Sequence, residues 1–238
     1  MDAFRSWSFW TGWRCFLISP WLLVASPNVL ATDLVYLNRC AAGCTVQPGP
    51  DDAINHVSSI PSSARSLAAF PYGDANFVAT AGCLRQAFSR YDVTVTTVDP
   101  GAAPRREIML AGLSQSLGLP AGLEAITPIY PQPRDNAIAF VFAEQLLGDI
   151  DKMCWLAAQN VGLLYALDHE LHCPDLMSTW IGCGLKSFVD FNAPCGENAP
   201  RTCLNGSSIQ NSAALLAIVP GLGDRLFLND FERATPTP

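Results

Sequence analysis

The sequence is poor in the residues and motifs that usually identify an enzyme. It holds three histidines in 238 residues, and it contains no C-x-x-C pair, no G-x-S-x-G turn and no glycine-rich phosphate signature. It shows no internal repeat and no cluster of lysine or arginine, and its net charge is −7 at pH 7. These absences argue against a nucleotide-binding enzyme, a serine esterase, and a protein that binds nucleic acid or an anionic membrane surface.

Long apolar runs are absent as well. The run near the N-terminus, 16–24, is about half of the ~20 residues that a membrane-spanning helix needs. It follows Arg5 and Arg14, and the small residues around Ala31 suit a signal peptidase. The pattern predicts a secretory signal peptide over 1–31, with a retained membrane anchor as the alternative.

Removal of this signal would leave a chain of net charge −8 without a stable membrane span. Its length suits one domain with its own core, which we place at 32–220, followed by a tail at 221–238. We expect a secreted, periplasmic or extracellular protein.

The cysteine count agrees with export. Of nine cysteines, Cys15 lies in the signal and eight remain, an even number that favours four disulfides in an oxidising compartment. A thiolate metal site is the rival interpretation. Eight cysteines allow 105 pairings, so the sequence does not fix the connectivity. Spacing suggests Cys40 with Cys44, Cys173 with Cys183, and Cys195 with Cys203, and Cys83 with Cys154 would then remain.

Apolar periodicity predicts strands interleaved with helices, which is typical of an α/β fold. The expected strands are 34–37, 66–70, 91–98, 107–111 and 136–142. The expected helices are 77–91, 149–167 and 209–219, and the expected loops are 40–50, 117–133 and the cross-linked 173–206.

One segment, 157–177, reads AAQNVGLLYALDHELHCPDLM. It resembles the metzincin signature of zinc peptidases, HExxHxxGxxH followed by a Met-turn. Residues between and beside the ligand positions are shared, namely Val161, Gly162, Tyr165 and 167–170. Met177 follows His169 at the spacing of the Met-turn. From CAAGC near its start to CGEN and TCLNG near its end, the mature chain is also similar to a group of secreted bacterial proteins related to metzincins.

The resemblance implies a twisted mixed sheet, an active-site-type helix, a disulfide-rich loop region and a C-terminal helix. It also assigns a place to each motif residue. Gln159 and Leu163 stand at the first two histidine ligands, Asn160 at the general-base glutamate, Ala166 at the glycine, and His169 at the third histidine.

Most of the chemistry of that signature is missing. A leucine cannot bind a metal, a glutamine offers only a weak neutral oxygen, and catalytic zinc usually needs three protein ligands. An asparagine cannot take a proton from water, and a positioned base typically contributes about 10²- to 10⁴-fold to rate. We therefore expect no cofactor and no catalytic residue, and the function favoured is a secreted pseudo-peptidase whose cleft still binds a peptide or protein.

Two alternatives stay open. The first is an active zinc-dependent hydrolase with an altered site, built from His169, His172 and one carboxylate. The second is a structural, disulfide-stabilised envelope or extracellular domain. Without a metal, we expect His169 to be hydrogen-bonded in a former cleft, His172 to be exposed, and His56 to be solvated in a polar loop.

Overall fold

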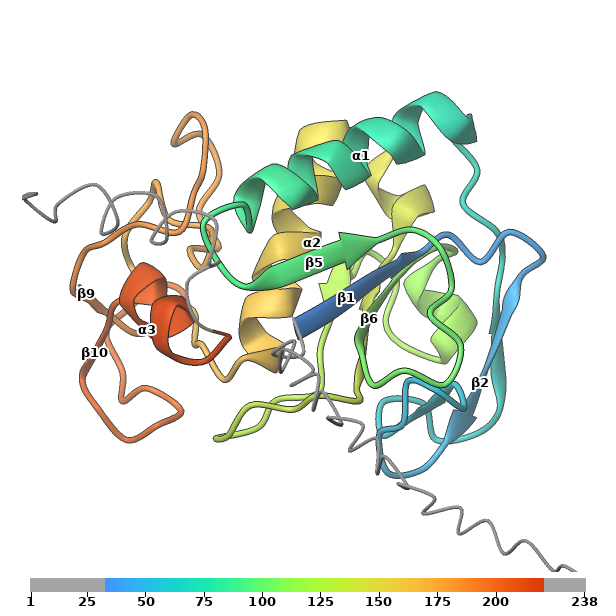
Figure 1. Cartoon of the computed structure of the whole chain (residues 1–238), viewed down its shortest axis with the longest axis horizontal. Helices are drawn as coiled ribbons and strands as arrows, with labels where there is room; N and C mark the ends of the chain where they lie inside the picture. The colour runs from blue at the N-terminus through green and yellow to red at the C-terminus, as the bar shows by residue number, and fades with distance from the viewer. Residues whose placement is uncertain (1–32, 221–238) are drawn as a thin grey trace, which may run out of the picture. The chain divides into compact units, whose positions relative to one another are not determined.

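The computed structural model describes residues 33–220, which form a mixed α/β fold (Figure 1). A five-stranded sheet has the order β5-β1-β6-β8-β7, in which the first four strands are parallel and β7 runs antiparallel to β8. The strands are β1 (Asp33–Asn38), β5 (Val93–Thr96), β6 (Arg106–Leu110), β7 (Ala125–Ile126) and β8 (Ile138–Val141).

Both faces of this sheet are buried. Successive residues of a strand point to opposite sides of the sheet, and residues on each side belong to an apolar core. In β6, Ile108 and Leu110 join one apolar core, and Met109 between them joins a second. Every residue of β8 is buried, as expected for a strand that is covered on both faces.

Helices α1 (Gly73–Ala87) and α2 (Ile150–Leu164) pack against each other and against the first face. The Asp149 side chain caps α2 by accepting a hydrogen bond from the Lys152 backbone N–H at 3.0 Å, which satisfies one free donor of the first turn. The third helix in the described residues is α3 (Ser212–Ile218), capped by Asn211.

Smaller elements complete the fold. The second face is covered in part by a three-stranded sheet and a short 3₁₀-helix, and the region before α3 carries a two-stranded sheet. These elements are β2 (Cys44–Pro48), β3 (Val57–Ser58), β4 (Arg65–Leu67), η1 (Ser114–Leu117), η2 (Ala143–Leu146), β9 (Ala193–Pro194) and β10 (Ile209–Gln210).

Four disulfides cross-link the described chain, and they match the pairing that spacing suggested. Cys83–Cys154 joins α1 to α2 across 71 residues of sequence, and the other three close short loops. Within residues 33–220, no helix has both the length and the apolar character that crossing a bilayer requires. The predicted signal at 1–31 and the predicted tail at 221–238 lie outside the described residues.

Several sequence predictions need correction. The helix expected over 77–91 is α1, which begins at Gly73 and ends at Ala87, and the loop expected over 173–206 contains β9. The loop expected over 40–50 contains β2, and the loop expected over 117–133 contains β7. Strand β7 is two residues long, too short for a periodic pattern, and its pairing comes from the distant β8. The C-terminal helix begins at Ser212 rather than Ile209, because Ile209 and Gln210 pair with β9 instead.

Candidate functional site

Helix α2 ends in a turn that carries the chain toward His169. The Leu167 N–H donates to the carbonyl of Gly162 and the Ala166 N–H to that of Leu163, both at 3.0 Å. This pair of bonds is a Schellman motif, whose residue after the cap takes the left-handed conformation. Ala166 has a φ of 63°, so an alanine adopts here the backbone that favours glycine, at the position where HExxHxxGxxH carries glycine.

We therefore expect Ala166→Gly to stabilise the chain by about 0.5–1 kcal/mol. The left-handed region costs an L-residue roughly 1–2 kcal/mol, and relief of that cost exceeds the extra entropy that glycine loses on folding. Urea unfolding measures the change. The matched control is Ala79→Gly on the exposed face of α1, where glycine should destabilise by about 1 kcal/mol; equal destabilisation by both variants would contradict the turn described here.

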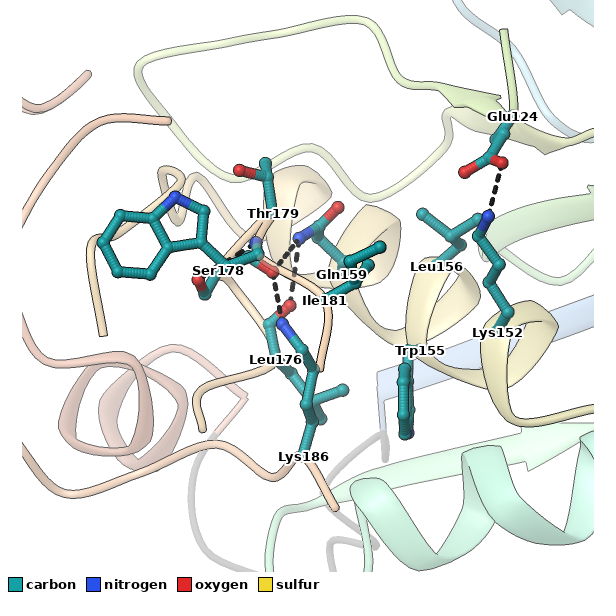
Figure 2. Close-up of a pocket in the computed structure, with 11 residues that line it drawn as sticks. Glu124, Lys152, Trp155, Leu156, Gln159, Leu176, Ser178, Thr179, Ile181 and Lys186 are labelled. Carbon is teal, nitrogen blue, oxygen red and sulfur yellow. Dashed lines mark hydrogen bonds and ion pairs between the residues drawn. The ribbon is translucent and has the colours of Figure 1, made fainter. Parts of the chain in front are cut away.

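Gln159 connects α2 to the turn that holds Met177. Its Nε2 atom donates to the carbonyl oxygens of Leu176 at 3.1 Å and Ser178 at 3.3 Å (Figure 2). The side chain is 8% exposed, so these bonds satisfy an amide that is almost out of water. Gln159 thus links the helix to the turn.

Asn160 is held in a similar way. Its Nδ2 atom donates to the Leu156 carbonyl at 2.6 Å, and its Oδ1 atom is hydrogen-bonded to the hydroxyl of Thr127, just after β7. Leu163 lies one turn after Gln159 and is nearly buried. The Asn160 amide thus ties the helix to the edge of the sheet.

His169 belongs to a network of charges. Its Nδ1 atom lies 3.0 Å from Glu197 Oε1, and Arg201 binds Glu197 at 2.6 Å. Arg201 also holds the buried Asp168 with two bonds of 2.6 and 2.7 Å. The hydrogen bond from Arg201, with a smaller one from His169, lowers the pKa of Glu197 to about 2. His169 is therefore hydrogen-bonded to a carboxylate of the following loop.

These residues do not fit a catalytic zinc ion. Asp168, His169 and Glu197 each place a possible ligand atom within 4.8 Å of the others, but Arg201 already engages both carboxylates. A divalent cation there would have to displace the guanidinium. The structure thus groups His169 with Asp168 and Glu197, whereas the sequence alternative grouped it with His172.

The side chains of the other two histidines are less exposed than the sequence predicted. His172 is half-buried, not exposed, and its ring stacks on Phe191 with centroids 4.4 Å apart. His56 is also half-buried, with its Nε2 atom 3.6 Å from the fully buried carboxylate of Glu107. Its loop is polar, as the sequence indicated, but it packs over a carboxylate that is distant in the chain.

Met177 is fully buried against α2. Its backbone N–H donates to the Asp175 carboxylate at 2.7 Å, and Ser178 closes a turn onto the Asp175 carbonyl at 3.1 Å. A Cβ added to Gly162 would lie 2.5 Å from the Met177 sulfur. Glycine at 162 is thus what allows the methionine to pack directly beneath the helix.

Below this turn lies a pair of carboxylates whose burial the sequence did not indicate. Glu170 and Asp175 are 1% and 0% exposed. Asp175 accepts from Met177, Val189 and Ser212, whereas Glu170 Oε2 accepts from Gln210 at 3.2 Å and its Oε1 has no partner among the described residues. Burial first, and the Asp175 charge second, raise the pKa of Glu170 to about 8.

This shift predicts a loss of stability as pH rises. The folded chain keeps on Glu170 a proton that the unfolded chain releases near pH 4.5, so the stabilisation is complete below that pH and is lost as pH rises through about 8. Glu170→Gln should remove most of this decline between pH 5 and 8.5, because glutamine does not ionise. Urea unfolding at both pH values checks it; the exposed control Asp151→Asn should keep the original slope, and an unchanged slope in Glu170→Gln would refute the prediction.

A cleft of about 410 Å³ lies between α2 and the chain around β7. Gln159, Asn160, Leu163 and His169 all line it, although they come from both sides of the helix end. Its opposite wall is formed by 122–127, including the edge strand that the sequence did not reveal. Four of the five positions that the motif assigns therefore line one surface.

Comparison with known proteins does not identify a function for this cleft. No family model matches the sequence, and a search of curated proteins finds no match.

Proposed function

We propose that this chain is a secreted, metzincin-like pseudo-peptidase whose cleft binds a peptide segment without cleaving it. One observation carries the proposal. The residues at the three ligand positions and at the base position all line the same cleft, which is where a zinc peptidase would hold the bond to be cut. The cleft is retained while its catalytic groups are replaced.

The surrounding fold supports this proposal. The sheet is mixed, α2 ends in a left-handed turn at the glycine position, and Met177 is buried beneath that helix. These are features that the metzincin resemblance implied. The four disulfides support a role outside the reducing cytoplasm.

The shape of the cleft suits an extended peptide. Strand β7 pairs with β8 on one side and is the last strand of the sheet on the other. An edge strand offers unpaired backbone groups to an added strand, and an extended peptide can dock by continuing the sheet. The apolar Leu163 and Leu156 on the facing helix offer contacts to its side chains.

The same residues argue against cleavage. Zinc would supply a bound water with a pKa near 7, but His169 is the only strong ligand among the aligned positions. Asn160 has no basic lone pair to accept a proton, and both ends of its amide are hydrogen-bonded. Binding and catalysis are thus separable in this site, and only binding is proposed.

The test is a pool of short fluorescein-labelled peptides with randomised sequence, added to the purified disulfide-bonded chain. We expect saturable binding by fluorescence polarisation and intact peptides by mass spectrometry. Ala125→Trp, in the wall of the cleft, should abolish binding. The matched control Ala79→Trp, on the exposed face of α1, should bind normally.

Two outcomes would overturn the proposal. Binding that survives Ala125→Trp would place the ligand elsewhere on the chain. Stoichiometric zinc on the unsubstituted chain, lost in His169→Ala together with peptide cleavage, would support the hydrolase instead.

A further inference from the structure

The whole chain contains two lysines, Lys152 and Lys186. Both line one pocket, of about 70 Å³, between α2 and the loop that follows Met177 (Figure 2). The two residues are far apart in sequence, and the fold brings them to the same place. This pocket therefore holds all the lysine ammonium groups that the protein has.

The pocket adjoins the cleft proposed to bind a peptide. Four residues line both, namely Glu124, Leu156, Gln159 and Thr179. A peptide lying along β7 can thus insert one side chain between α2 and the loop. Gln159 marks the boundary, because its amide binds the loop carbonyls on the pocket side.

The two lysines are in different electrostatic states. Lys152 forms an ion pair with Glu124, which also lines the pocket. Lys186 donates to the carbonyl oxygens of Ser178 at 2.6 Å and Asp175 at 3.3 Å, and within residues 33–220 no carboxylate oxygen lies within 4.0 Å of its Nζ atom. The half-buried Lys186 is thus a cation whose ligands in the fold are neutral.

An ammonium group has three hydrogens to donate, and the fold uses two of those of Lys186. Partial burial lowers the pKa of this lysine, which means that removal from water disfavours its charge. An incoming anion would offset that cost and accept the third hydrogen. A cationic side chain would meet repulsion at the same point.

The walls of the pocket are apolar and held in place. Trp155 and Ile181 line it, and Trp180 is anchored by a 2.8 Å bond from its indole N–H to the Glu197 carbonyl. The Cys173–Cys183 disulfide closes the loop that carries Trp180 and Ile181. Such walls suit the methylene stem of a side chain whose polar end reaches Lys186.

We propose that the peptide bound in the cleft places an acidic side chain in this pocket, with its carboxylate on Lys186. This inference rests on the proposed function and names the ligand class for that site: a peptide with a glutamate or aspartate beside the segment that lies along β7. The pocket is a specificity site, and Lys186 is the residue that selects an acidic side chain by pairing with its carboxylate.

Matched peptide pools test this selectivity on the unsubstituted chain. The pools are randomised at all positions except a central one, which is fixed as glutamate in one and as its neutral isostere glutamine in the other. We expect the glutamate pool to bind about tenfold more tightly, the effect of one charge-assisted hydrogen bond. Equal affinities would overturn the inference and leave the proposed function standing, whereas no binding by either pool would overturn both.

Variants then assign the preference to Lys186. Lys186→Met should bring the two affinities together, and Lys186→Arg, which keeps the positive charge, should retain a preference for glutamate. If Lys186→Met kept the full preference for the glutamate pool, another group would be the one that binds the carboxylate. Thermal unfolding of both variants establishes that they are folded.

Acetylation supplies an independent measurement, because each lysine gives a separate peptide in mass mapping. The glutamate pool should protect Lys186 from a limiting amount of an acetylating reagent, and the glutamine pool should protect it less. Equal acetylation of Lys186 with and without the glutamate pool would contradict a direct contact.

Discussion

A chain that carries Gln159→His, Asn160→Glu, Leu163→His and Ala166→Gly will bind about one zinc ion per molecule, whereas the unsubstituted chain will retain none after dialysis. Positions 159 and 163 lie one turn apart on α2 and line the same cleft, so two imidazoles there can bind one ion. His169 would be the third ligand, as catalytic zinc requires.

The surroundings of His169 already suit this role. Its Nδ1 atom is engaged by Glu197, and histidines that bind metals usually give one ring nitrogen to a carboxylate while the other binds the ion. Metal analysis of the purified variant measures the zinc content. Adding His169→Ala should remove most of the metal; a quadruple variant that is folded, with four disulfides, but free of zinc would show that the metzincin resemblance is misleading.

Loss of the Cys83–Cys154 disulfide should have the largest effect on stability. In the loop-entropy account, a cross-link across 71 residues restricts the unfolded chain by about 4 kcal/mol, and one across 10 residues by about 2.5 kcal/mol. Cys83→Ala with Cys154→Ala should therefore lower the free energy of unfolding by more than Cys173→Ala with Cys183→Ala.

Guanidinium unfolding of the two double variants makes the comparison. The long-loop variant should also loosen the contact between α1 and α2, which hydrogen exchange in both helices can detect. If the short-loop variant were the less stable of the two, native-state packing around that loop would outweigh chain entropy.

The sequence predicted the elements that have a local signal. Strand β8 is a run of apolar residues and α2 has a helical period with an acidic cap, so each could be placed within a few residues. Strand β7 could not be, because two residues carry no period and its partner strand supplies the hydrogen bonds. The cleft could therefore be identified only from the structure, although the motif had indicated the helix that forms one of its walls.

The same division holds for the side chains of the site. The motif identified Gln159, Asn160 and His169, and the absence of a strong metal ligand and of a base at the first two could be argued from residue type alone. Their present partners could not, because Thr127, Leu176 and Glu197 come from other segments. Glu170 and Asp175 could be noticed only as carboxylates near His169 and His172, and nothing indicated their burial, since a buried carboxylate looks like a surface one in a sequence.

The placement of both lysines in one pocket has a practical consequence for any study of this protein. Reagents that attach proteins to sensor chips, dyes or cross-linkers through amines react with lysines and with the N-terminal amino group, and the only lysines in the sequence are Lys152 and Lys186. Every molecule coupled through one of these lysines would have its pocket blocked before any ligand was added. Capture through an affinity tag leaves both amines free, and binding measured by the two methods should differ.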